Sequence, residues 1–174
     1  MNSRFFRFNI YLLSLLALFG AGCQMTAKKL ESTLELHVEV NPDGTANNGP
    51  VPIGRGDVSF HVNVENAPFL MEGNVEQAFV VDALGGFQIM VQFDRKGTLL
   101  LEQYSTAYKG KRVAILSEFG EVRWLAAPLM ANRITDGALI FTPDATREEA
   151  DRIVNGLNYV AKEVKKGNRC SVGG

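Results

Sequence analysis

The sequence of 174 residues contains only two cysteines and two histidines. This small number of cysteines excludes a scaffold held together by disulfides. It also leaves few candidate residues for a zinc site or for a catalytic cysteine. A strong charge of one sign is also missing, because 18 basic residues stand against 19 acidic ones, a net charge of −1. Nucleic acid is therefore not an expected partner. Apolar residues make up 46% of the chain, which indicates a folded core rather than disorder.

Motifs that carry enzyme chemistry are missing as well. The sequence has no G-x-S-x-G elbow, no H-E-x-x-H helix and no P-loop. The segment Gly54-Arg55-Gly56-Asp57 has no strand-to-helix context, so it does not indicate phosphate binding. We therefore expect a protein that is not an enzyme and that uses no cofactor.

The first 23 residues carry the sharpest local signal. Arg4 and Arg7 precede an apolar run over residues 10–22. This run is shorter than the roughly 20 residues that span a bilayer, and it suits the h-region of a secretory signal peptide. It ends in small residues directly before Cys23. The pattern predicts a signal peptide over residues 1–22.

The segment Gly20-Ala21-Gly22-Cys23 resembles the lipobox of bacterial lipoproteins. In that family a peptidase cleaves before the cysteine once its sulfur carries a diacylglycerol, so the resemblance makes Cys23 the lipidation site. Gly20 departs from the Leu that the family prefers. Gln24 replaces the Asp that often retains lipoproteins in the inner membrane, which favours the outer membrane. The resemblance implies a lipid-anchored protein of the bacterial cell envelope that faces the periplasm. The alternative is a plain secretory signal with an incidental cysteine.

The rest of the chain divides into three parts. Residues 23–32 are a short polar tether, residues 33–166 form one domain, and the Gly- and Ser-containing residues 167–174 form a flexible tail. Cys170 lies in that tail. We expect it to be an exposed bystander, with an intermolecular disulfide as the alternative.

Alternation of apolar and polar residues predicts most of the strands. Over residues 34–40, Leu and Val alternate with Glu35, His37 and Glu39, which we assign to a solvated face. Five further strands are predicted over residues 58–64, 77–84, 87–93, 122–126 and 138–141. Residues 112–117 are nearly continuously apolar, which predicts a central strand covered on both faces. The segment 41–57 is rich in Asn, Pro and Gly and is expected to be a loop.

Two helices follow from capping residues and apolar periodicity. Asp94 is the expected N-cap of the first helix, which ends before Gly110. Thr146 and Glu149 form a capping box for the second helix, which ends before Gly167. Each helix presents one apolar stripe. The predicted fold is therefore α+β, a mainly antiparallel sheet with two helices packed on one face.

Taken in order, these segments resemble the first periplasmic (head) domain of SecD, a subunit of the Sec protein-export machinery. The matching pieces are 34–40 (L-x-F-R-x-V), 68–80 (P-x-L-T-G-x-x-L-x-x-A-x-V), 93–97 (F-T-x-E-G), 110–116 (G-K-x-L-A-I-V), 126–128 (S-A-P), 134–137 (I-T-G-G) and 148–150 (E-E-A). The resemblance extends over residues 33–164. Two departures stand out: Glu118-Phe119-Gly120-Glu121 replaces a D-G turn, and Ala126 replaces Ser.

The resemblance implies a non-catalytic module that binds unfolded polypeptides or protein partners, linked to protein export and to the Sec machinery. The membrane helices that couple SecD to the proton gradient have no match here, so energy transduction is not implied. The alternative is a structural or assembly lipoprotein of an envelope complex, which keeps the fold without capturing polypeptide.

Four apolar residues near Pro128 are the candidate protein-binding residues: Trp124, Leu125, Leu129 and Met130. Aromatic and Met side chains beside a proline-broken strand can form an adaptable apolar surface for peptides. Packing in the core explains the same residues equally well.

A metal site has a weaker basis. If the first two strands pair, His37 and His61 approach each other, with Glu35 and Glu39 alongside. No close ligand spacing supports a metal site, and a solvated sheet face with cross-strand pairs accounts for the same residues. We expect no metal.

Overall fold

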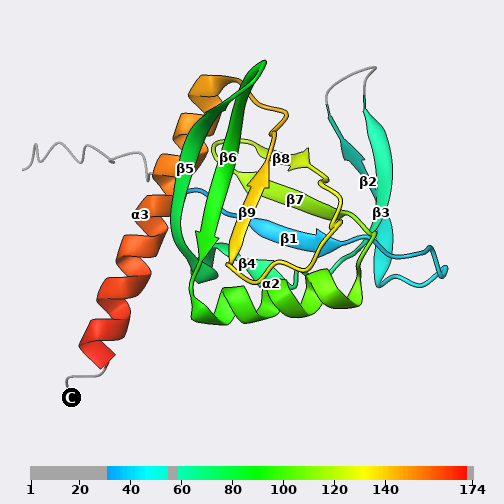
Figure 1. Ribbon diagram of the computed structural model, residues 1–174, viewed down its shortest axis with the longest axis horizontal. Helices are drawn as coiled ribbons and strands as arrows, with labels where there is room; N and C mark the ends of the chain where they lie inside the picture. The colour runs from blue at the N-terminus through cyan, green and yellow to red at the C-terminus, as the bar shows by residue number, and fades with distance from the viewer. Residues whose placement is uncertain (1–30, 55–58, 172–174) are drawn as a thin grey trace, which may run out of the picture.

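The computed structural model describes residues 31–54 and 59–171. The predicted signal peptide, Cys23 and most of the tether lie outside the described residues. In chain order the elements are β1 (Glu35–Val38), β2 (Asn48–Ile53), β3 (Phe60–Glu65), β4 (Leu70–Met71), the 3₁₀ turn η3 (Glu72–Asn74), β5 (Val75–Ala83), β6 (Gly86–Phe93), α2 (Arg95–Ala107), β7 (Val113–Glu118), β8 (Val122–Ala126), β9 (Ala138–Phe141) and α3 (Arg147–Ser171) (Figure 1).

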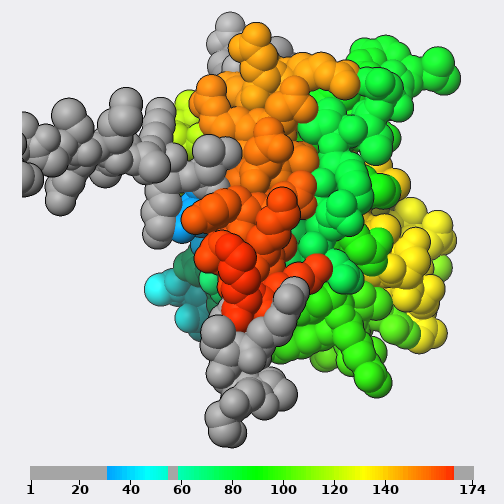
Figure 2. Space-filling model, turned by 90° about the vertical axis from the view of Figure 1, so that its left-hand side faces the viewer, coloured from blue at the N-terminus to red at the C-terminus, as the bar shows by residue number. Residues whose placement is uncertain are grey.

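The described strands form three antiparallel sheets with the orders β4-β1-β7-β8, β2-β3 and β5-β6-β9. Helix α3 lies along β5, and α2 packs against β4 and β6. Figure 2 shows α3 covering this flank of the domain, next to β5 and β6. The α+β class and the antiparallel pairing are confirmed. The single sheet that the sequence suggests is divided into three, because the strands of the three-stranded sheet run across β1 and β7 (Figure 1).

The main core lies between the two larger sheets and the helices. The four-stranded sheet contributes Leu36 and Ile115, the three-stranded sheet contributes Ile89 and Phe93, and α3 contributes Leu157, all at most 1% exposed. Burying one such side chain stabilises the fold by about 1.5–3 kcal/mol. Leu157 occupies the middle of the predicted apolar stripe of α3, so this part of the sequence interpretation is correct.

The opposite face of the four-stranded sheet is covered by the β2–β3 hairpin. A second apolar cluster forms there, with Trp124 packed against it; its members are Ile53, Val62, Val64, Ala114 and Ala127. The prediction of a solvated face was wrong for His37, which is only 4% exposed. The alternation of apolar and polar residues shows that the two faces of a strand differ, but it does not reveal whether another part of the chain covers the polar face.

Strand β2 was missed because Pro50 and Pro52 favour a loop. Both residues pair with β3, and β2 is an edge strand with a single partner. A proline is tolerated at an edge, where its missing N–H is not needed by a second neighbour.

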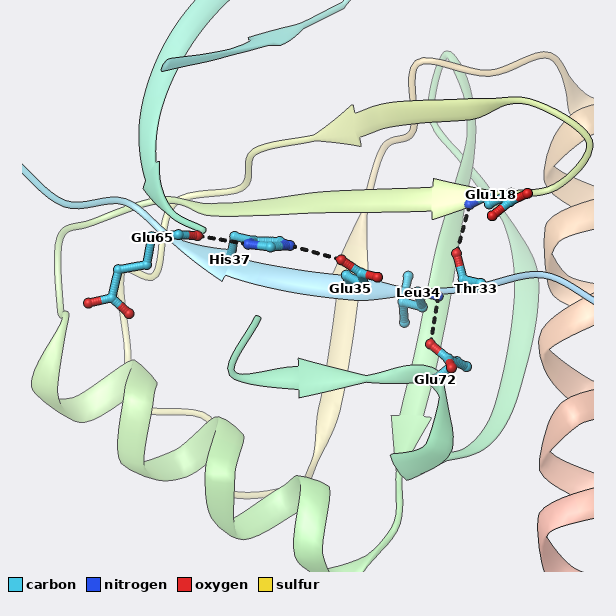
Figure 3. Close-up of polar contacts among 7 residues, drawn as sticks. All are labelled: Thr33, Leu34, Glu35, His37, Glu65, Glu72 and Glu118. Carbon is cyan, nitrogen blue, oxygen red and sulfur yellow. Dashed lines mark hydrogen bonds and ion pairs between the residues drawn. The ribbon is translucent and has the colours of Figure 1, made fainter. Parts of the chain in front are cut away.

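Strand β1 is held by polar contacts along its length (Figure 3). The ring of His37 lies 2.8 Å from the Glu65 carbonyl oxygen through Nδ1 and 3.3 Å from Glu35 Oε2 through Nε2. At the other end, the Leu34 N–H donates to Glu72 Oε2 at 3.4 Å, and the Glu118 N–H donates to the Thr33 hydroxyl. These contacts join β1 and the residues just before it to β3, η3 and β7.

Both helices begin as the sequence predicts. Asp94 caps α2 by accepting a hydrogen bond from the Gly97 N–H at 2.7 Å. At α3 the Thr146 N–H donates to Glu149 Oε2 at 2.7 Å, and the Glu149 N–H donates to Thr146 Oγ1 at 3.2 Å. The C-terminus of α3 differs from the prediction, because the helix continues past Gly167 to Ser171. The segment predicted as a flexible tail is therefore helical over residues 167–171.

The described chain starts by crossing α3. Ser32 is 2% exposed and lies against Gly156, where an added Cβ would stand 2.7 Å from the Ser32 backbone nitrogen. Only a glycine in α3 leaves room for this crossing. No helix within the described ranges is both long and apolar enough to cross a membrane.

Candidate binding groove

The two edges of the three-stranded sheet differ in how they are covered. At β5, the side chain of Asn158 in α3 closes the edge: its Oδ1 accepts from the Ala78 N–H at 2.8 Å, and its Nδ2 donates to the Ala78 carbonyl oxygen at 2.9 Å. The amide thus makes both hydrogen bonds that a neighbouring strand would make. The opposite edge, β9, pairs with β6 alone among the described strands.

The register of β9 determines which backbone groups point outward. The Phe93 N–H donates to the Gly137 carbonyl oxygen at 2.9 Å, and the pairing continues as Val91–Leu139 and Ile89–Phe141. Hydrogen-bonded pairs recur at every second residue of an antiparallel ladder. The N–H and C=O of Ile140 therefore point away from β6, and no described residue forms a hydrogen bond with them.

Two hollows lie along this free edge. The larger, about 840 Å³, is lined by the end of β9 and the residues after it, by Leu125–Pro128 and by Ile53 and Phe60 of the hairpin. The smaller, about 240 Å³, is lined by the start of β9 and by the segment 128–134. Both are lined by Pro128 and Ile140, so together they form a groove between β9 and the segment after β8, which we call the β9 groove.

The described lining of the β9 groove is nearly uncharged. Asp144 is the one charged residue among the described lining residues of the two hollows. Its N–H donates to the Leu125 carbonyl oxygen at 2.7 Å, which joins the segment after β9 to β8. Exposed apolar side chains stand at the groove: Phe60 is 45% exposed, Ile140 49% and Leu129 54%. Such a surface suits an apolar, uncharged ligand segment.

The four predicted binding residues are divided between core and surface. Leu125 and Met130 are 1% and 3% exposed and belong to the main core, and each also lines one of the two hollows. Leu129 is exposed at the groove. Trp124 is half-buried, lies edge-on to the His37 ring with centroids 5.1 Å apart, and does not line either hollow. Three of the four predicted residues thus line the hollows, and Leu129 is the exposed one among them. Ile140, which we did not single out, lines both hollows.

A second surface feature is a stack of three half-buried rings. Phe69 stacks on Tyr104 with centroids 4.1 Å apart, and Tyr104 stacks on Tyr108 at 5.5 Å. Burial, with the nearby Glu65 carboxylate, raises the pKa of Tyr104 above its ordinary value. These rings join α2 to the segment before β4, which gives them a role in packing.

The predicted histidine pair does not form a metal site in the described chain. His61 is exposed and pairs across the hairpin with Pro52, while His37 is buried under the hairpin. Within residues 31–54 and 59–171, no three side chains of the metal-binding types stand together.

The architecture is that of an α+β domain built from antiparallel sheets and two helices. The particular fold is SecD-like. A solved structure described as "a membrane component SecDF that enhances protein export" superposes with a TM-score of 0.56 at 21% identity, covering 78% of this chain and 67% of that one. SecDF in a "super-membrane-facing form" gives 0.53 at 21% identity, covering 73% of this chain and 18% of that one. This chain therefore spans about a fifth of the second protein's length. The sequence matches no protein-family model and no curated protein.

Proposed function

We propose that this chain is a non-catalytic, lipid-anchored protein of the bacterial cell envelope whose SecD-like module binds unfolded polypeptides or protein partners in the β9 groove. In this proposal Cys23 carries the lipid, the domain faces the periplasm, and the outer membrane is favoured. The role is linked to protein export, with association with the Sec machinery.

The observation that carries the proposal is the β9 groove itself. A hollow of about 840 Å³ with an almost uncharged described lining lies beside a strand edge whose outward N–H and C=O are unbonded among the described residues. Exposed apolar surface next to unpaired backbone is a feature that proteins normally cover unless it binds something. The SecD-like fold supports the same role, since the SecDF of the matched structure enhances protein export.

A binding experiment tests the proposal. We expect a permanently unfolded secretory polypeptide, reduced, alkylated and fluorescently labelled, to bind the protein weakly and with little sequence preference. Leu129→Asp and Ile140→Asp should each weaken binding by about tenfold, because a carboxylate would lose its hydration in an apolar groove. Both side chains are half-exposed, so the melting temperature should change little.

Leu99→Asp is the matched control, because Leu99 is 59% exposed on α2 and does not line the β9 groove. It should bind like the wild type. Equal affinity for all four proteins, or no binding by the wild type, would contradict the proposed function. Crosslinking in cells should then recover one fixed partner, as expected of a structural lipoprotein, rather than diverse secretory chains.

The lipid anchor is tested separately. We expect Cys23→Ser to abolish lipidation, because the thiol is the acceptor of the diacylglycerol, and to leave an uncleaved precursor. Detergent partitioning of the wild type and the variant measures the effect. The anchor prediction is wrong if both proteins remain in the aqueous phase.

A further inference from the structure

We propose that the β9 groove takes one extended peptide segment as an added strand, paired with β9 through the backbone of Ile140. This inference rests on the proposed function and goes further by giving the conformation and chemistry of the ligand. The ligand is an extended segment without charged side chains in the paired stretch, bound by β-strand addition.

The backbone groups at the edge supply the recognition. Ile140 directs both its N–H and its C=O away from β6, in the geometry that an added strand requires. The Ala138 N–H is already engaged by Asp136 Oδ1 at 3.1 Å, so the open part of the edge is centred on Ile140. The two hydrogen bonds of Asn158 to Ala78 show the same type of pairing already made at the other edge of this sheet.

The side chains on the outer face of the sheet extend the argument. Phe79 pairs with Met90, and Met90 pairs with Ile140, so these three side chains form an apolar row across the sheet. Phe79 is 37% exposed and Ile140 is 49% exposed. A ligand residue opposite Ile140 would continue this row, and cross-strand apolar pairs favour Val, Ile or an aromatic residue there.

The far wall of the groove determines what can enter. Across from β9 stands the segment that contains Pro128 and Leu129, which is tied to β7 by the Val113 N–H to the Pro128 carbonyl oxygen at 3.0 Å. We expect a single extended strand to enter between these two walls. A second folded copy of this chain would have to bring its own β9 past the wall, so a peptide segment is the favoured occupant.

The test uses N-methylated peptides on the wild-type protein. The probe is a labelled peptide of alternating Val and Thr residues flanked by Lys, with one backbone nitrogen methylated in each member of a series. Methylation at the residue that pairs with Ile140 should weaken binding by about tenfold, and methylation at its immediate neighbours should have little effect. The loss of affinity is therefore expected to vary with a period of two residues along the peptide.

Two variants provide an independent measurement. Ile140→Pro removes the outward N–H, which β6 does not use, whereas Ile140→Ala shortens the side chain and keeps the N–H. We expect Ile140→Pro to bind the probe several-fold more weakly than Ile140→Ala. Melting temperatures of both variants establish that the sheet is intact, and amide exchange at Ile140 in the wild type should slow when the peptide binds.

The outcomes separate this inference from the proposed function. Binding without a two-residue period, and with equal affinity for the Pro and Ala variants, overturns strand addition but leaves polypeptide binding standing. No binding of the probe or of any unfolded polypeptide overturns both. Concentration-dependent self-association that Ile140→Pro abolishes would identify a second copy as the occupant and would also overturn the inference.

Discussion

Gly156→Ala provides a sharp test of the packing between Ser32 and α3, because its expected effect on stability is opposite in sign to the usual effect of replacing Gly by Ala in a helix. In the middle of a solvated helix, replacing Gly by Ala stabilises by about 1 kcal/mol. In α3, however, the new Cβ would stand 2.7 Å from the Ser32 nitrogen and 2.8 Å from the Ser32 Cβ. The first of these is a backbone atom and cannot rotate away. Overpacking a buried site costs about 1–3 kcal/mol, and the upper part of that range applies here.

The expected net effect of Gly156→Ala is a loss of about 1–2 kcal/mol in the free energy of unfolding. For a domain of this size the melting temperature should fall by about 3–8 °C, measured by thermal unfolding. The matched control is Asn155→Ala, the exposed neighbour, which should be neutral or slightly stabilising. A Gly156→Ala variant as stable as the wild type would refute the close crossing of Ser32 over α3.

Two further perturbations address the core and the first loop. Leu157→Ala should lower the free energy of unfolding by about 2–5 kcal/mol, because Leu157 is fully buried. Lys162 is exposed, so Lys162→Ala should change the free energy of unfolding little. Equal melting temperatures for the two variants would contradict the packing of α3. Asp43 accepts hydrogen bonds from the Thr45 N–H, the Thr45 hydroxyl and Asn48, which lower its pKa. The carboxylate therefore stabilises the loop above its ordinary pKa of 3.8, and this contribution disappears as the pH falls. Asp43→Asn should be less stable than the wild type at neutral pH, and the difference should shrink as the pH is lowered below 3.8; a difference that stays constant in acid would contradict this reasoning.

Local signals in the sequence predict the helices and strands themselves better than they predict which elements pack or pair with one another. The caps at Asp94 and Thr146 and the turn before β6 depend on residues close in the chain, so they can be predicted. The edge position of β9 depends on which strands pair with it, and no pattern within residues 138–141 contains that information.

The division of the candidate binding residues has the same cause. Leu125 and Leu129 are both apolar and lie four positions apart, yet one is 1% exposed and the other 54%. Asp144, from the segment after β9, bonds to the Leu125 carbonyl oxygen, and this long-range contact helps to place Leu125 in the core. Sequence analysis found three residues that line the groove, Leu125, Leu129 and Met130, but it could not tell which of them is exposed.

The amide of Asn158 limits the stoichiometry of any assembly on the three-stranded sheet. A sheet with two open edges can polymerise, because each added chain presents a new edge to the next one. Here the Ala78 edge is occupied by the protein's own helix, so chains stacked through this sheet cannot form a continuous fibre. The protein can therefore keep one backbone edge open, and pairing of two copies through their β9 edges would stop at a dimer.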